Sequence, residues 1–233
     1  MPAPLPGPPG NWPRPTAKTD SIDARLLAAM AQALNPQPHA PPDPERGELA
    51  DLHRRREQLV GFRQMERTRL HTAGPDIGAS IADHLDWLDA RIRQFDRQIA
   101  DRIRNSATLS LAAALLRSIP GIGAVTATAL LALLPELGKR SGKTIAALGG
   151  LAPINRDSGN YRGQRSIAGG RPEVRRALYM AALTASRSNS RFAAAYKAFI
   201  ANGKAPKLAL VAIARKLLVT ANAILATSKP FLT

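Results

Sequence analysis

The sequence predicts a mainly α-helical protein, and three observations support this fold class. Apolar residues recur at helical spacing along most of the chain, glycines and prolines punctuate these periodic segments, and no segment reads as a strand. The chain has 233 residues, which is enough for one or two domains with real cores. We therefore expect a helical hairpin or coiled coil, followed by a compact helical domain that contains a helix-hairpin-helix motif.

The N-terminal residues 1–18 are rich in proline. Met1–Pro15 holds seven prolines and two glycines and offers almost nothing to bury, so we expect a disordered leader. Thr19 or Asp20 then fits the N-cap of a helix. The apolar residues that follow at helical spacing are Ile22, Leu26, Leu27 and Met30. Asn35–Pro44 is a second proline-rich break.

Residues 45–105 carry two charged helical segments, separated by a Gly74-Pro75 breaker. The second segment has the clearer apolar seam, with steps of three or four residues, as in a coiled coil. Its members are Ile81, Leu85, Leu88, Ile92, Phe95, Ile99 and Ile103. The seam needs a partner, which is either the other helix of the same chain or a second subunit.

Residues 106–233 change to an alanine- and leucine-rich pattern. We expect four helices in this part of the chain, at Leu109–Leu116, Ala124–Leu134, Glu173–Ser186 and Pro206–Ala226. A polar, glycine-rich stretch, Gly149–Pro172, separates the first two helices from the last two.

The charge is concentrated in the C-terminal part of the chain. Of the formal net charge of +16, residues 1–105 contribute +1 and residues 106–233 contribute +15. Such an excess attracts a polyanion and favours phosphate contacts. There is no cysteine, which excludes disulfides and thiolate metal sites. No apolar run matches a membrane span and the leader does not fit a signal peptide, so we expect a soluble cytoplasmic protein without a membrane partner.

The first candidate site is the Ile119–Gly123 turn between two apolar helices. Gly121 and Gly123 allow a tight turn that presents N–H groups at a helix start, where a phosphate can bind without reading a base. This is the helix-hairpin-helix arrangement. The alternative is a plain helix–helix turn, and the local charge favours phosphate binding.

The second candidate is a pair of carboxylates, Asp20 and Asp23, three residues apart on one helix face. Paired carboxylates are suitable Mg²⁺ ligands. Acidic residues in a first helical turn are also ordinary helix chemistry, and taken locally this alternative is favoured.

The third candidate is Ser158, on a glycine-flanked loop among arginines. A serine placed there could attack a phosphodiester while guanidinium groups hold the phosphate. The arginines concerned are Arg162, Arg165, Arg171, Arg175 and Arg176. No histidine lies nearby in sequence to act as a base, and without further information a loop that only contacts phosphate is favoured.

Several of these motifs together resemble a known family. They are Ile119–Gly123, Gly150–Pro153 with Ser158-Gly159, Gly169–Arg171 with Arg175–Leu178, Lys207 with Ala214–Leu217, and Lys18–Arg25. The combination is similar to the insertion-sequence one-hundred-and-ten family of DEDD, bridge-RNA-guided transposases, and to its C-terminal serine transposase domain of the IS116/IS110/IS902 type.

The resemblance implies specific roles. Ser158 would be the nucleophile, Asp20 and Asp23 would be the last two of four Mg²⁺-binding acids, and DNA, a guide RNA and further copies of the chain would be partners. The other two acids lie upstream in the family, and only 19 residues precede Asp20 here, so we expect the RuvC-like domain to be largely absent. The alternative is a catalytically inactive nucleic-acid-binding remnant.

The resemblance also divides the chain. The expected parts are a leader at 1–18, a remnant of the RuvC-like domain at 19–44, a helical hairpin or coiled coil at 45–105, and the C-terminal serine transposase domain at 106–233.

Overall fold

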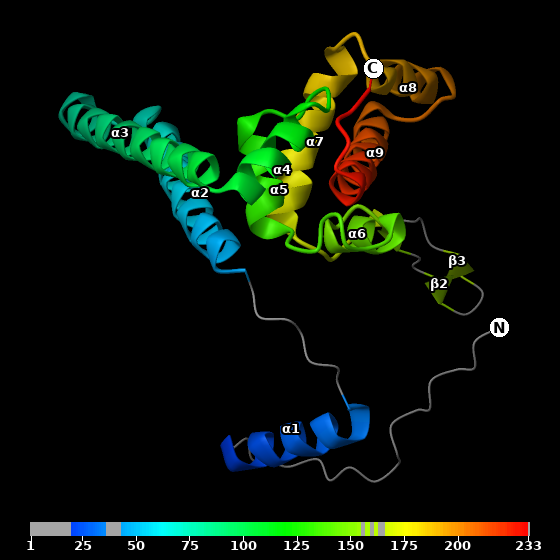
Figure 1. Cartoon of the computed structure of the whole chain (residues 1–233). Helices are drawn as coiled ribbons and strands as arrows, with labels where there is room; N and C mark the ends of the chain where they lie inside the picture. The colour runs from blue at the N-terminus through cyan, green and yellow to red at the C-terminus, as the bar shows by residue number, and fades with distance from the viewer. Residues whose placement is uncertain (1–19, 36–42, 155–156, 159–160, 163–165, 233) are drawn as a thin grey trace. The chain divides into compact units, whose positions relative to one another are not determined.

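The computed structural model describes residues 20–35, 43–154, 157–158, 161–162 and 166–232. The chain divides into two units, of which the first ends at Pro41 and the second begins at Pro42. The described part of the first unit is the helix α1 (Asp20–Leu34), whose first turn contains Asp20 and Asp23 (Figure 1). The helix start agrees with the sequence prediction, while residues 1–19, including the proposed leader, lie outside the described part.

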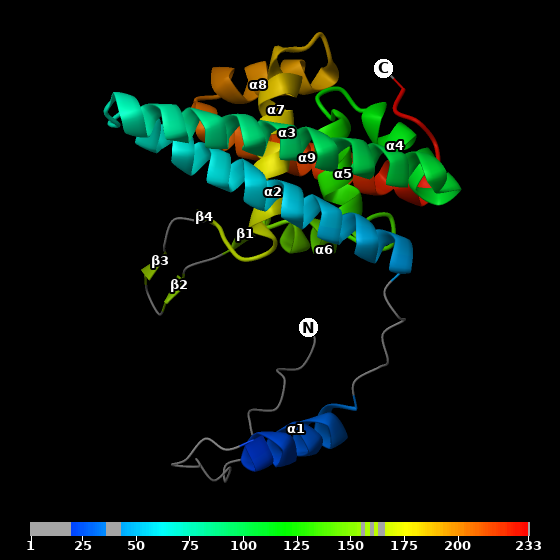
Figure 2. The ribbon, with the colours of Figure 1, turned by 90° about the vertical axis from the view of Figure 1, so that its left-hand side faces the viewer.

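The second unit begins with two long helices, α2 (Pro44–Leu70) and α3 (Pro75–Asn105). Each has a proline in its first turn, where the missing N–H costs nothing. Figure 2 shows them side by side, and ion pairs from Arg56 to Asp96 and from Arg63 to Asp89, both at 2.7 Å, show that they run antiparallel. The predicted helical pair is therefore present, with the turn where the Gly74-Pro75 breaker predicted it.

The apolar seam of α3 packs mainly against α2 of the same chain. Leu88, Ile92 and Ile99 are buried, and Leu59 of α2 packs with the first two of them. This contact supplies the intramolecular partner that the seam required. Association of the two helices with a second subunit, and coiled-coil packing in the strict sense, stay predictions.

In the rest of the second unit the described residues form six helices, with short strands between α6 and α7 (Figure 1). They are α4 (Ala107–Arg117), α5 (Ala124–Leu133), α6 (Gly142–Leu148), α7 (Pro172–Arg187), α8 (Arg191–Ala201) and α9 (Pro206–Thr227). Helix α5 lies at the centre and touches α2, α4 and α7, and its residues from Thr126 to Ala132 are all buried. The predicted helices agree with α4, α5, α7 and α9 to within about two residues, whereas α6 and α8 were not predicted.

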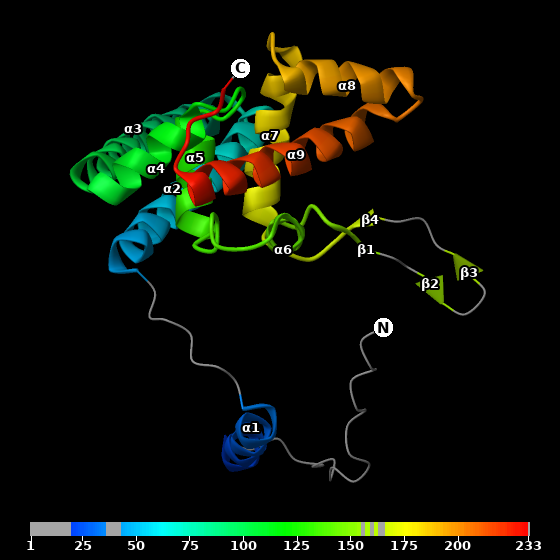
Figure 3. The same ribbon diagram turned by 45° about the vertical axis from the view of Figure 1, so that its right-hand side comes forward.

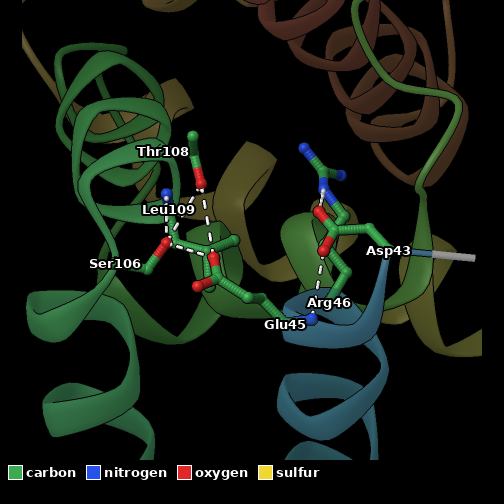
Figure 4. A network of polar contacts seen from close by, with 6 residues as sticks. All are labelled: Asp43, Glu45, Arg46, Ser106, Thr108 and Leu109. Atoms are coloured by element: carbon green, nitrogen blue, oxygen red, sulfur yellow. Dashed lines mark hydrogen bonds and ion pairs between the residues drawn. The ribbon is translucent and has the colours of Figure 1, made fainter.

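A polar junction joins α2 to the start of α4 (Figure 4). The Ser106 hydroxyl donates to a carboxylate oxygen of Glu45 at 2.5 Å and accepts from the Leu109 N–H at 3.3 Å. Ser106 is therefore the N-cap of α4 and also an anchor for the first turn of α2. The two long helices are tied by this junction to the compact helical part.

Helix α9 corrects one expectation from the sequence. Its 22 residues are long and apolar enough to cross a membrane, although no such run was predicted. Half of its most apolar window is buried within the protein, as in the core helix of a globular fold. The buried Asn222 supports this interpretation, because its side chain accepts from the Gly138 N–H and donates to the Arg140 carbonyl, both at 2.9 Å. Insertion of α9 into a membrane would remove both partners.

Four short strands also depart from the expectation that no strand would be found. The outer pair is β1 (Pro153–Ile154) with β4 (Ser166–Ile167), and the inner pair is β2 (Asp157–Ser158) with β3 (Tyr161–Arg162), both antiparallel. The second pair is nested within the first along the chain between α6 and α7, and we refer to the four strands as the β-hairpin (Figure 3). Two-residue strands have no period to detect, which is why the sequence pattern did not predict them.

Candidate functional site

The candidate nucleophile lies near the tip of the β-hairpin. Ser158 is the last residue of β2. In the antiparallel register of the inner strand pair it lies opposite Tyr161 of β3. The structure places Ser158 and Arg162 by their backbone only, and Arg165 lies outside the described residues. The predicted serine therefore lies on the inner of the two strand pairs, which β1 and β4 flank along the chain.

The base of the β-hairpin is a close crossing of two glycine-containing segments. Gly150 leaves α6 with a φ of 66°, and Gly169 and Gly170 lead into α7 with φ values of 65° and 62°. A Cβ on Gly170 would fall 2.6 Å from the Ala147 carbonyl oxygen and against the backbone of Gly150. Only glycine suits both the left-handed backbone and this approach. We refer to Gly150, Gly169 and Gly170 as the hairpin base.

Arg175, in the first turns of α7, holds the hairpin base together. Its Nη1 atom donates to the Gly169 carbonyl at 3.0 Å and to the Gly150 carbonyl at 3.3 Å, so one guanidinium bonds both crossing segments. The Gly150 carbonyl lies in the segment that connects α6 to β1, and the Gly169 carbonyl lies in the segment that connects β4 to α7. Arg175 was predicted to contact phosphate, and in this structure its guanidinium is bonded to protein acceptors.

Arg171, the residue directly after the hairpin base, makes a second set of stabilising contacts there. Its guanidinium donates to both carboxylate oxygens of Glu136 at 2.7 Å each, and its backbone N–H donates to the Leu148 carbonyl at 2.9 Å. The hydrogen bond from Arg171 is the main cause that lowers the pKa of Glu136, and the same bond raises the pKa of Arg171. Both partners therefore stay charged at neutral pH, in the fork geometry that arginine and carboxylate share.

Glu136 is a site residue that the sequence analysis missed. It lies in the turn after α5, and its partner is thirty-five residues away in the chain. Residues 106–233 contain only three acidic residues. The rarity of acidic residues in so basic a region was the sequence signal that could have indicated a paired carboxylate at Glu136. Arg176, next to Arg175, is exposed and has no hydrogen bond or ion pair within the described part of the chain.

The two glycines of the Ile119–Gly123 turn differ in their surroundings. Gly121 has a φ of 90°, and a Cβ there would lie 2.5 Å from the Ala181 carbonyl and 2.7 Å from the Ala185 Cβ on α7. Its role is therefore to let the turn pack closely on α7. Gly123 is the N-cap of α5 and is open, because a Cβ on this residue would meet no atom within 4 Å. Phosphate binding at this turn stays a prediction, and of its two glycines only Gly123 is open.

The two candidate metal ligands lie in the first turn of α1. Asp20 is exposed and Asp23 is half-buried. Within residues 20–35, 43–154 and the later described segments, no group of three or more acidic or histidine side chains is placed to hold a metal ion. Two carboxylates alone do not complete the coordination of a Mg²⁺ ion, so binding by Asp20 and Asp23 would require further ligands and stays a prediction.

A helical protein whose C-terminal part carries a large excess of basic residues has the electrostatic features of a nucleic-acid-binding protein. Residues 113–197 match the family described as "Transposase IS116/IS110/IS902 family", and residues 11–73 match a second family model described as "Transposase". The chain is also similar to the "Pilin gene-inverting protein" of Moraxella lacunata and that of Moraxella bovis. Each is 33% identical over 219 residues, which cover 92% of this chain and 68% of the relative.

These matches establish the family. The chain belongs to the IS110-type transposases, as its motifs indicated. The first match includes α5, the hairpin base and α7, so the site described above lies in the part that defines the family.

Proposed function

We propose that this protein is a DNA recombinase that cleaves and rejoins strands with Ser158 as the nucleophile. The observation that carries the proposal is the position of Ser158 at the outer end of a β-hairpin, on a domain with a net charge of +15, in a chain that belongs to a transposase family. A projecting hairpin can bring a hydroxyl to a phosphate that the bulk of the domain does not enclose. We place this activity in the cytoplasm, together with the DNA on which it would act.

The proposed chemistry is a transesterification. The Ser158 oxygen forms a bond to a DNA phosphorus while one bridging P–O bond breaks, and the serine proton leaves with a base or with the departing DNA hydroxyl. The product is a phosphoserine-linked strand. A DNA hydroxyl later attacks the same phosphorus and returns the proton to the serine, so no external energy source is required.

Phosphate binding is divided among several groups in this proposal. Arg162, Arg165 and the exposed Arg176 contact phosphates near the β-hairpin, and the open α5 start at Gly123 holds another through its N–H groups. Arg171 and Arg175 do not contact the phosphate in this proposal. They stabilise the hairpin base, which positions the β-hairpin that carries Ser158.

The DEDD family name implies a divalent metal, and we propose that Asp20 and Asp23 supply two of its ligands. When bound, Mg²⁺ would stabilise charge on the attacking and leaving oxygens. These two carboxylates are only part of the ligand set that the ion would require. Further copies of the chain and a guide RNA are the proposed partners, and base pairing with that RNA would select the target.

A covalent-trapping experiment tests the proposal. The purified chain is incubated with Mg²⁺, DNA from the element ends and RNA from its flanks, and protein–DNA adducts are counted on a denaturing gel. Ser166→Ala, on the return strand of the same β-hairpin, is the matched control for Ser158→Ala. We expect an adduct with the wild type and with Ser166→Ala, and none with Ser158→Ala.

The opposite results are also informative. Adducts that survive Ser158→Ala would refute the role of this serine. Salt-sensitive DNA binding without an adduct from any variant would support the alternative, in which the chain binds nucleic acid but does not cleave it.

A further inference from the structure

Three exposed cations lie close together in the chain, on the loop that leads into α6 and in its first turn. We refer to Lys139, Arg140 and Lys143 as the basic cluster. Within the described residues, none of their side chains makes an ion pair or a hydrogen bond. Glu136, the acidic residue nearest to them in sequence, is already bonded to Arg171 at 2.7 Å. The basic cluster therefore keeps its charge available to a ligand.

Cations on the two long helices are arranged differently. Arg56 and Arg63, for example, are each paired at 2.7 Å with a carboxylate of the neighbouring helix, Asp96 and Asp89. Their charge is balanced within the protein, whereas the basic cluster holds three like charges that repel one another. Unpaired like charges gathered on one surface attract a polyanion and favour contacts with its phosphates.

A buried side chain of α9 fixes the backbone of the basic cluster. Asn222 is 7% exposed, and its amide accepts from the Gly138 N–H and donates to the Arg140 carbonyl, both at 2.9 Å. It thereby bonds the chain on both sides of Lys139. A polar group inside an apolar helix is costly to bury unless it is bonded, and here both bonds go to this one loop.

Two glycines bring the same loop close to α9. A Cβ on Gly138, whose φ is 84°, would lie 3.0 Å from the Cβ of Leu225, and one on Gly142 would lie 3.3 Å from a methyl group of Val219. Val219, Asn222 and Leu225 follow one another at three-residue steps, so one face of α9 contacts the loop along its length. The cations are thus presented from a fixed backbone, which lowers the cost of ordering them when a ligand binds.

The basic cluster is also joined to the hairpin base. Helix α6 begins within the cluster and ends at Gly149, directly before Gly150 of the hairpin base, and Figure 3 shows it leading from the α9 side to β1. Its seven residues span about 10 Å. The Glu136–Arg171 pair makes a second connection, from the same loop to the residue after the hairpin base.

We propose that the basic cluster binds the phosphodiester backbone of duplex DNA beside the β-hairpin, independently of base sequence. The length of α6, about 10 Å, equals the axial rise of about three base pairs, so one duplex can contact both the basic cluster and the hairpin base. The inference deepens the proposed function and rests on it only in requiring that the chain binds DNA. It does not depend on Ser158 or on strand cleavage.

The test measures binding of the full chain to a short labelled DNA duplex by fluorescence anisotropy at several salt concentrations. The double variant Lys139→Gln/Lys143→Gln removes two of the three charges. Each phosphate contact on duplex DNA contributes about 0.9 to the slope of log K against log salt, so the slope should fall by about 1.8. Unfolding in urea should match that of the wild type, because both side chains are exposed.

The double variant Lys197→Gln/Lys204→Gln is the matched control. It removes the same charge from two exposed lysines, one on α8 and one just after it. Figures 1 and 2 show α8 and α6 on opposite sides of this unit. The control should leave the slope unchanged.

A second measurement isolates the role of Asn222. Asn222→Ala frees the loop, so DNA affinity should fall about threefold through the added cost of ordering the cations. In the Lys139→Gln/Lys143→Gln background the fall should be smaller, whereas the loss of stability in urea should be the same in both backgrounds. An equal fall in affinity in the two backgrounds would show that Asn222 supports only the fold.

Three results would overturn the inference. The first is an unchanged slope in Lys139→Gln/Lys143→Gln, and the second is an equal loss of slope in the control. The third is a loss on duplex RNA but not on duplex DNA of the same sequence, which would assign the surface to RNA. Absence of salt-dependent DNA binding by the wild type would refute the proposed function itself, whereas a missing Ser158 adduct alone would leave this inference standing.

Discussion

Arg175 and Arg176 are adjacent arginines of α7 for which the structure predicts opposite behaviour. Arg175 bonds the Gly150 and Gly169 carbonyls, whereas Arg176 is exposed and makes no such bond within the described residues. We expect Arg175→Ala to destabilise the protein and Arg176→Ala to weaken its DNA binding. Because the two residues are identical in type and neighbours in sequence, each variant is the control for the other.

The magnitude follows from the contacts. A hydrogen bond from a charged donor contributes about 1.5–3 kcal/mol when well buried. The two bonds of Arg175 are 3.0 and 3.3 Å long and its side chain is half-buried, so we expect Arg175→Ala to cost about 2 kcal/mol in total. For a unit of this size, that corresponds to a fall in Tm of about 4–8 °C. Arg176→Ala should change the stability by less than about 0.5 kcal/mol.

Binding should show the reverse pattern. Each phosphate neutralised on duplex DNA contributes about 0.9 to the slope of log K against log salt. Arg176→Ala should lower this slope by about one, and Arg175→Ala should leave it unchanged. Unfolding in urea followed by circular dichroism, and anisotropy titrations at several salt concentrations, measure the two quantities. An Arg175→Ala variant of wild-type stability with a reduced slope would refute the assignment of Arg175 to the hairpin base.

Three further predictions concern stability. Glu136→Gln should cost about 1 kcal/mol at neutral pH for this partly exposed pair. Because Arg171 lowers the pKa of Glu136, the contribution is present above the ordinary glutamate pKa and is lost as the pH falls through the lowered value, so urea curves of variant and wild type should converge in acid. Gly121→Ala should cost about 2–4 kcal/mol from its φ of 90° and its clash with α7, and Gly123→Ala less than about 0.5 kcal/mol, by the same measurement. Ser106→Ala should cost about 1–2 kcal/mol through loss of the α4 cap and of the bond to Glu45, and a thermal melt indistinguishable from wild type would contradict this.

Helical periodicity predicted the elements that are long and amphipathic. The seam of α3 and the breaker at Gly74-Pro75 located both long helices, because seven apolar residues at regular steps average out local exceptions. Helix α6 was missed because its seven residues begin with Gly142 and are too few to show a period. Helix α8 was missed although its eleven residues begin at Arg191, directly after a serine that can start a helix.

The sequence predicted which residue types occur in the candidate site, but not which hydrogen bonds they make. The motifs around Ser158 indicated a serine on a glycine-flanked segment among arginines, and the structure places that segment on a β-hairpin. The partners of Arg171 and Arg175 depend on contacts between residues far apart in the chain or on backbone carbonyls, which carry no sequence signal. Residue type therefore predicted which side chains can bind a phosphate, but not which of them the protein already uses.

Because some arginines are already bonded within the protein, the net charge overstates the number of cations that are available to bind DNA phosphates. The value of +15 for residues 106–233 counts every cation equally, including Arg171, whose charge is matched by Glu136 at 2.7 Å. An arginine bonded within the protein in both the free and the bound state displaces no counterion from DNA, so it adds nothing to the salt dependence. The slope should accordingly report only exposed cations such as Arg176 and Arg117. If instead the slope approached the full formal charge, the protein would have to open the Glu136–Arg171 and Arg175 contacts on binding, and the hairpin base would be a moving part of the mechanism.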